Sequence, residues 1–208
     1  MNKISKKVST QLFLLFCVFV SSLVLDQISK VHSEEALLLS SDKDNVKLYH
    51  GKQIPLLSTG DRLKGTYFSF GLQYVRNQGA AWGALQNLDD SIREPFFYGV
   101  TLLAVIMIMY FFRTTPTSHR LARMALVLVL SGAIGNFLDR IRLTYVIDWI
   151  DVRWRVFGWY YDFPKFNIAD SCITLGVTFL LIDMLILEPK RNKKQKPQEN
   201  QTLPQQTA

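Results

Sequence analysis

Aspartate is the residue type with the clearest chemical potential in this chain, because six aspartates stand at the ends of apolar stretches or between them. Two carboxylates a few ångströms apart cannot both ionise comfortably, so they share one proton, and one group then acts as a base while the other acts as an acid. Such a pair can activate water for attack on an amide without a metal ion. The residue types alone do not decide which two would form the pair. The six are Asp26, Asp139, Asp148, Asp151, Asp162 and Asp170.

Several of these aspartates also have a purely structural interpretation. Asp26 and Lys30 are four residues apart on an expected helix, where an acid and a base can form an ion pair. Asp139 is adjacent to Arg140 and can find partners nearby. Asp170 stands where a helix is expected to begin, and a carboxylate there can cap the free N–H groups of the first turn.

Other catalytic and metal-binding chemistries have little support. The three histidines, His32, His50 and His119, are scattered, and neither H-E-x-x-H, C-x-x-C nor G-x-S-x-G occurs. Cys17 and Cys172 belong to different depths of the expected helices, which argues against a disulfide between them. We therefore predict no metal site, no cofactor and no disulfide.

Four long apolar stretches must position the carboxylates. Hydrophobic residues make up 49% of the 208 residues, and the mean hydropathy is +0.11. A helix needs about 20 residues to cross the hydrocarbon core of a bilayer. The stretches therefore predict four transmembrane helices, rather than a soluble protein with four buried core helices. The expected spans cover about residues 8–28, 95–112, 121–138 and 170–188.

Lysine and arginine gather in three of the segments that these helices separate. The N-terminal segment, the connection between the second and third spans, and the C-terminal tail each carry a net charge of +3, whereas the other two connections are nearly balanced. Because positive charge stays on the cytoplasmic side, both termini are expected in the cytoplasm and the long loops 29–94 and 139–169 outside. This topology accounts for the basic pI of about 9.4, so nucleic acid is not an expected partner.

A single membrane domain is expected over residues 1–189. Residues 1–25 have the charge and the apolar stretch of a signal peptide, but no A-x-A-like cleavage site follows, so we interpret them as a retained first helix. Residues 190–208 are polar and rich in Gln and Lys, and they are expected to form a disordered cytoplasmic tail.

The two long loops contain segments with the composition of strands. Thr66–Val75 and Tyr145–Val156 are rich in aromatic and β-branched residues, and Gly158 is expected to mark a turn. The small residues of Asn77–Gly83 would let another backbone approach closely, so this segment forms either an ordinary loop or a cap over a site. No element is assigned to Glu34–Gly65. The predicted fold class is a four-helix membrane protein with a small β platform and a loop cap on the outer, periplasmic face. A belt at the membrane interface is expected from Trp149, Trp154, Trp159, Tyr160 and Tyr161.

Five segments, in order along the chain, resemble the signature blocks of the lipoprotein signal peptidase family, signal peptidase II. Each block alone is weak, but five in order, from the end of the first expected span to the start of the fourth, are specific. Members of that family are aspartyl proteases of the bacterial inner membrane. They remove the signal peptide from lipid-modified prolipoproteins by cutting before the diacylglyceryl-cysteine. The segments are Asp26–Lys30, Asn77–Gly83, Ser131–Arg140, Val146–Asp151 and Phe166–Ser171.

The resemblance implies a role for individual residues. Asp148 and Asp170 would be the catalytic dyad, whereas Asp26, Lys30 and Asp139 would be structural. The positions that would line the substrate groove or hold the dyad in place are Asn77, Gly79, Gly132, Asn136, Arg140 and Asn167.

The resemblance also implies a location and partners. The protein would lie in the bacterial cytoplasmic (inner) membrane with its active site facing the periplasm, contact membrane lipid, act on lipid-modified prolipoproteins, and bind cyclic-peptide inhibitors such as globomycin. The chain departs from the family pattern at Ser131, where Gly is more frequent, and at Trp82 and Trp149, where Phe is more frequent. Its first outer loop also looks longer. None of these departures touches the two aspartates.

Two other functional classes are compatible with acids in a small membrane protein. A proton-coupled transporter would usually place them near the bilayer midplane and often shows inverted repeats, whereas here they lie at the expected boundary. A non-enzymatic scaffold would not need both Asp148 and Asp170. Cleavage of a lipidated precursor separates the three classes.

Overall fold

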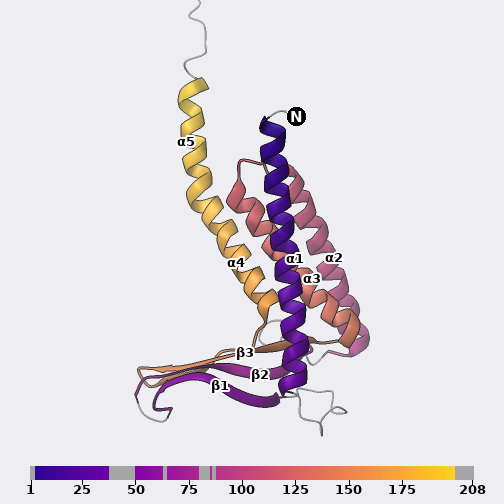
Figure 1. The fold of residues 1–208 in the computed structure, drawn as a ribbon, viewed down its shortest axis with the longest axis vertical. Helices are drawn as coiled ribbons and strands as arrows, with labels where there is room; N and C mark the ends of the chain where they lie inside the picture. Colours follow the sequence, from indigo (N-terminus) through magenta and orange to yellow (C-terminus); the bar gives the residue numbers. More distant parts are fainter. Residues whose placement is uncertain (1–2, 38–49, 63–64, 80–84, 86–87, 200–208) are drawn as a thin grey trace, which may run out of the picture.

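The computed structural model describes residues 3–37, 50–62, 65–79, 85 and 88–199. Within them, four helical segments are long and apolar enough to cross a membrane, and this confirms the four spans expected from the sequence. They form an elongated bundle (Figure 1). The helices are α1 (Lys3–Leu37), α2 (Asp90–Thr114), α3 (Arg120–Leu143) and a continuous rod made of α4 (Ile168–Ile182), the π-helical segment η3 (Asp183–Leu187) and α5 (Glu188–Glu199).

Helix α3 lies at the centre of the bundle and packs against α1, α2 and α4. It approaches α4 closely because glycines stand where the two helices meet. A Cβ on Gly132 would lie 2.3 Å from the carbonyl oxygen of Ala169, and a Cβ on Gly176 would lie 2.7 Å from that of Ala125. Small residues of this kind let helix backbones pack tightly in a membrane. The close α3–α4 contact brings the first turn of α4 against the last turns of α3.

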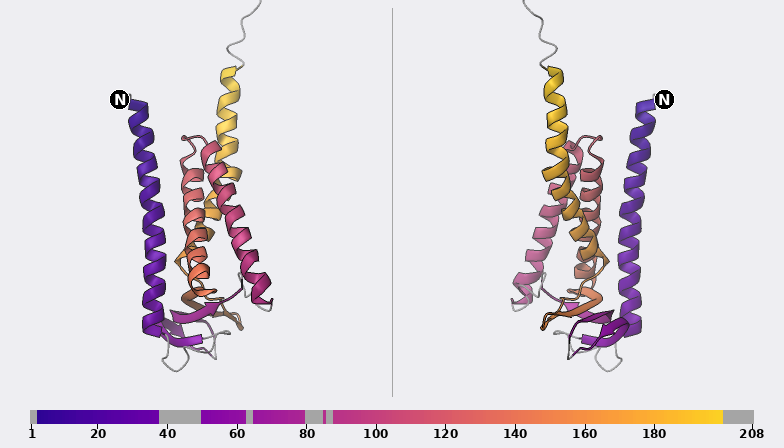
Figure 2. Two further views of the ribbon diagram at one scale, coloured as in Figure 1. Left: turned by 90° about the vertical axis from the view of Figure 1, so that its right-hand side faces the viewer. Right: turned by 90° about the vertical axis from the view of Figure 1, so that its left-hand side faces the viewer.

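A four-stranded antiparallel sheet crosses one end of the bundle, opposite the end that carries the N-terminus (Figures 1 and 2). We call this the sheet end of the molecule. The strand order is β1-β2-β3-β4, and the central pair places Phe68 opposite Trp154 and Phe70 opposite Val152. The strands are β1 (His50–Gly60), β2 (Tyr67–Asn77), β3 (Val146–Val156) and β4 (Trp159–Asp162).

Both strands expected from composition are present, as β2 and β3, and the turn at Gly158 is confirmed by its φ of 83°. The sequence did not predict β1 or β4. Strand β1 lies inside the stretch left without an element, and it contains Pro55, which cannot donate to a strand ladder. Proline is tolerated there because β1 is an edge strand.

Helix α1 continues to Leu37, well beyond the expected end near residue 28. Its last residue lies in a small buried cluster at the sheet, formed with Tyr74, Tyr145 and Ile147. This contact explains the extension, because one side of the final turns of α1, with Ser33 and Leu37, is buried against protein while the other side stays exposed.

The C-terminal segment also differs from expectation. A disordered tail was expected from residue 190, but helix α5 continues to Glu199, and residues 200–208 lie outside the described part of the chain. Asp183 is only 5% exposed and forms an ion pair with Arg191, two helical turns further on. This pair ties the start of α5 to the membrane-spanning helix.

Candidate active site

Asp148 and Asp170 come from different elements and meet at the sheet end of the bundle. Asp148 lies on β3 and is 2% exposed, and Asp170 lies in the first turn of α4. Two asparagine side chains connect them. The Asn167 amide donates to Asp148 Oδ1 (2.8 Å) and to Asn136 Oδ1 (3.2 Å), and the Asn136 amide donates to Asp170 Oδ1 (2.7 Å). The structure therefore brings together the two aspartates and the two asparagines that the sequence singled out.

Asp170 is held by the N-terminus of its own helix. The Asp170 N–H donates to Asn167 Oδ1 (2.9 Å), and the Asn167 N–H donates to Asp170 Oδ2 (3.3 Å). This reciprocal arrangement is a capping box. The residue that caps the first turn is thus Asn167, three residues before the position expected from the sequence, and Asp170 is its partner in the capping box. The hydrogen bond from the Asn167 N–H at the same time fixes the direction of the Asp170 carboxylate.

A second chain of contacts holds Asp148 from the other side. Asn77 donates to Asp148 Oδ2 (2.9 Å), and Asn77 Oδ1 accepts from the Gly79 N–H (3.0 Å). The Gly79 carbonyl in turn accepts from Arg140 (3.1 Å), whose guanidinium lies 4.4 Å from the centre of the Phe97 ring. Arg140 therefore supports Asp148 through the turn at Asn77 and Gly79. The rest of the expected cap, residues 80–83 with Trp82, lies outside the described residues.

The surroundings of Asp148 favour its neutral form. Burial, followed by the negative charge of Asp170, raises the pKa of Asp148 to about 8. The hydrogen bond from Asn77, the charge of Lys30 and the hydrogen bond from Asn167 act in the opposite direction. A carboxyl group with such a pKa carries a proton at neutral pH, which is the state that a general acid needs.

The expected ion pair between Asp26 and Lys30 is present, with 2.8 Å between the charged groups. Lys30 also pairs with Asp139 (2.8 Å), so the partner of Asp139 is Lys30, and no ion pair with its neighbour Arg140 is found among the described residues. The sequence could not reveal this choice, because Lys30 and Asp139 are more than one hundred residues apart.

Gly132 and Gly135 serve helix packing in this site. Gly132 faces the Ala169 carbonyl at the α3–α4 contact, and a Cβ on Gly135 would lie 2.7 Å from Asp26 Oδ2. Sequence reasoning missed Gly135. The available signal was its spacing of three residues from Gly132, which puts both glycines on one side of α3.

Asp151 and Asp162 belong to a separate network in the sheet. Asp151 is buried and pairs with Arg153 and Lys165, and Asp162 also pairs with Lys165. Gln53 donates to Asp151 from β1. Both acids are thus paired with cations of the sheet and have no contact with Asp170 or its asparagine partners among the described residues, so neither is a candidate for the pair.

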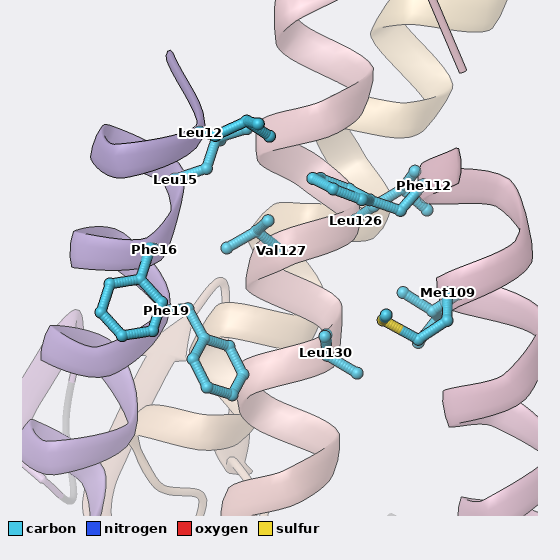
Figure 3. A pocket seen from close by; sticks show the side chains of 10 residues that line it. Leu12, Leu15, Phe16, Phe19, Met109, Phe112, Leu126, Val127 and Leu130 are labelled. Carbon is cyan, nitrogen blue, oxygen red and sulfur yellow. The ribbon is translucent and has the colours of Figure 1, made fainter. Parts of the chain in front are cut away.

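An apolar pocket lies near the other end of the bundle (Figure 3). It has a volume of about 200 Å³ and is lined by side chains of α1, α2 and α3, including Phe16, Met109 and Leu126. The lining holds no titratable group, so this pocket offers space for apolar atoms and no chemistry of its own. Among the described residues no group of three or more His, Cys, Asp or Glu side chains is arranged to hold a metal ion.

A sequence profile described as "Signal peptidase (SPase) II" matches residues 18–186, from the middle of the first span into the fourth, and this range includes the sheet and both aspartates. The chain belongs to the signal peptidase II family. It is therefore a protease, as this family name states, and its four apolar helices make it a multi-pass membrane protein.

Bacterial relatives of this signal peptidase II chain support the assignment. A lipoprotein signal peptidase of Geobacter sulfurreducens is 40% identical over 174 residues, covering 84% of this chain and 92% of the relative. One of Geobacter metallireducens is 45% identical over 124 residues, covering 60% of this chain and 73% of the relative.

The fold of this chain is shared with solved structures. Two structures described as bacterial membrane enzymes superpose with TM-scores of 0.59 and 0.56 at 28% identity. Each covers 83% of this chain, and the matches span 88% and 93% of the neighbours.

Proposed function

We propose that this chain is an aspartic endopeptidase that removes signal peptides from diacylglyceryl-modified prolipoproteins and cuts before the lipidated cysteine. Membership of the signal peptidase II family and the names of the bacterial relatives support the substrate class. The observation that carries the aspartic mechanism is the pair formed by the buried Asp148 and the half-buried Asp170, joined through Asn136 and Asn167.

In the proposed mechanism, Asp170 is the base and Asp148 is the acid. Asp170 lies at a helix N-terminus and accepts two hydrogen bonds, which favour a carboxylate. It takes a proton from water, whose oxygen attacks the carbonyl carbon of the scissile peptide bond. Asp148 gives its proton to the carbonyl oxygen as the tetrahedral intermediate forms.

The intermediate then collapses as the C–N bond breaks. The proton that Asp170 received passes to the leaving amine, and one proton of the intermediate returns to Asp148. The pair thus regains its single shared proton, and the net change is hydrolysis of one amide bond. Asn77, Asn136 and Asn167 keep the two carboxyl groups aimed at the reacting atoms through this cycle.

The position of the pair suits a substrate that is part lipid and part peptide. Asp148 and Asp170 lie where the sheet meets the helix ends, which we assign to the outer, periplasmic boundary of the inner membrane. There the acyl chains of a substrate can stay in the bilayer while its backbone reaches water. Each buried CH₂ group contributes about 0.8 kcal/mol, so the lipid holds the substrate at this depth. Cyclic peptides such as globomycin would compete for the same place.

The test compares one purified precursor with and without the diacylglyceryl group on its cysteine. We expect the wild-type protein to cleave the lipidated form and to process the unlipidated form poorly. Asp148→Asn and Asp170→Asn should each reduce turnover by about 10²–10⁴-fold, the range typical of acid–base groups. Asp162→Asn is the matched control, because Asp162 is 47% exposed and lies in the sheet network. Equal cleavage of both precursors, or near-wild-type turnover in either dyad variant, would contradict the proposal.

A further inference from the structure

The ammonium group of Lys30 lies inside the protein, next to groups that hold the aspartate pair, and not at the surface. Its side chain is 2% exposed, and its ammonium group has three partners. These are Asp26 at 2.8 Å, Asp139 at 2.8 Å and Asn136 Oδ1 at 3.0 Å. An ammonium group has three N–H donors, so all of its donors are used, and all within the protein.

The two carboxylates bound by Lys30 each hold the backbone next to one member of the pair. Asp26 accepts from the N–H of Ala169, the residue before Asp170, at 2.8 Å. Asp139 accepts from the N–H of Ile147, the residue before Asp148, at 3.2 Å. Lys30 therefore connects the start of α4, through Asp26, to β3, through Asp139. The distance between these two backbone segments sets the distance between the two aspartates.

The third partner of Lys30 fixes the direction of an amide. Because an ammonium group can only donate, the atom of Asn136 that faces it must be the oxygen. The amide nitrogen of Asn136 then points to Asp170, to which it donates at 2.7 Å. A reversed amide would present an oxygen to the Asp170 carboxylate and would remove this hydrogen bond.

We propose that Lys30 is a positioning residue for the aspartate pair, which sets its spacing through Asp26 and Asp139 and its hydrogen bonding through Asn136. This inference rests on the proposed function and extends it. The family resemblance implies only a structural role for Lys30. A positioning role predicts in addition that Lys30 variants change catalysis separately from folding.

Lys30 also contributes to the charge balance of the site. The charged and titratable groups near the pair are the cations Lys30 and Arg140 and the acids Asp26, Asp139, Asp148 and Asp170. This set contains four acids and two cations, and removal of Lys30 leaves Arg140 as the one cation of the set. A nearby cation favours a charged carboxylate, so loss of Lys30 should move the acidic limb of the pH–rate profile to higher pH.

The experiment compares Lys30→Met with Lys30→Arg on the lipidated precursor. We expect Lys30→Met to lower kcat at least about tenfold, because small misplacements of reacting groups are costly. KM should change little, and the acidic limb should rise by about one pH unit. Lys30→Arg keeps the charge, so its acidic limb should stay in place, but a planar guanidinium cannot reproduce the three contacts, and its kcat should fall.

The matched control is Asp183→Asn, which breaks another buried ion pair far from the site. It should lower the melting temperature without changing kcat or the pH profile. If Lys30→Met and Lys30→Arg behave like this control, with altered stability and wild-type kinetics, the positioning role is overturned. If Lys30→Met does not fold, Lys30→Arg decides: a lowered kcat at a near-wild-type melting temperature supports the role, and a wild-type kcat overturns it.

Cleavage by the wild-type protein tests the proposed function independently of the role of Lys30. Absence of cleavage by wild-type protein would refute the proposed function, and the role of Lys30 with it. Cleavage by wild-type protein together with unaltered kinetics in the Lys30 variants would refute the role of Lys30 alone.

Discussion

Asp148 and Asp170 carry the same functional group in two different environments. Asp148 is buried on a strand with two asparagine donors, whereas Asp170 lies in a capping box at the start of a helix. Burial and the neighbouring Asp170 raise the pKa of Asp148 to about 8. This difference assigns the acid and the base in the proposed mechanism, since a pair of titratable groups works when its environments separate the two proton affinities.

The raised pKa of Asp148 predicts a pH dependence of stability. The unfolded chain loses this proton near pH 3.8, while the folded protein keeps it up to about pH 8. The contribution of Asp148 to stability is therefore fully present below about pH 4 and is lost as the pH rises to about 8. Asp148→Asn cannot lose this proton. The melting temperature of Asp148→Asn minus that of wild type should increase between pH 5 and pH 8, and a difference that is constant or decreases would contradict the assignment.

At the scale of the elements, the contact between α3 and α4 positions Asp170 relative to the rest of the site. Glycines let the two helices approach, and Asn136 on α3 thereby reaches Asp170 on α4. Strand β3 brings Asp148 to the same place by pairing with β2, which also delivers Asn77. The two aspartates, Asn77 and Asn136 thus come from two helices and two strands, and Asp26 and Lys30 of a third helix, α1, contact the groups around them.

Gly132→Ala tests the importance of this helix contact. The added methyl group would lie 2.3 Å from the Ala169 carbonyl and 2.7 Å from Ile173, so the start of α4 must move. We expect a loss of about 1–3 kcal/mol in the free energy of unfolding and a reduced rate of cleavage. The control is Gly99→Ala on α2, where nothing lies within 4 Å of the new methyl group. Equal behaviour of the two variants, measured by melting temperature and turnover, would contradict the packing argument.

At the scale of the whole molecule, the sheet lies at the end of the bundle opposite to the start of α1 and to helix α5. The N-terminus and helix α5 project from one end, and the sheet covers the other (Figure 1). The Lys- and Arg-rich segments of the sequence all belong to the end with the termini. The rule that positive charge stays on the cytoplasmic side therefore predicts that this end faces the cytoplasm and that the sheet end faces outward.

Reporter fusions test this orientation. A reporter placed after Lys190 should read cytoplasmic, and one inserted between residues 42 and 49 should read external, because translocation of Lys and Arg is costly. Substituting the three N-terminal lysines Lys3, Lys6 and Lys7 by Gln should weaken the preference. An external reading at Lys190 would reverse the orientation and place the aspartate pair on the cytoplasmic side.

The sequence alone predicted the membrane fold, since four spans of this length and apolarity match the thickness of the hydrocarbon core of a bilayer. It also indicated β2 and β3, whose aromatic and β-branched residues favour strands. It did not reveal β1, whose polar residues and Pro55 lack the strand pattern and which is held by its pairing with β2. The same holds for α5, which was expected to be disordered and is tied to the preceding helix by Asp183 and Arg191.

For the site, the residue types marked the candidates, and the resemblance to a family chose Asp148 and Asp170 among them. Local rules correctly predicted the Asp26–Lys30 pair, because it depends on residues within one helical turn. They also placed Asp170 in the first turn of its helix, although the residue that caps this turn is Asn167. The network that joins the two aspartates was decided by the tertiary structure alone. Its members lie far apart in the chain, and only the α3–α4 contact and the pairing of β2 with β3 bring their side chains within hydrogen-bonding distance.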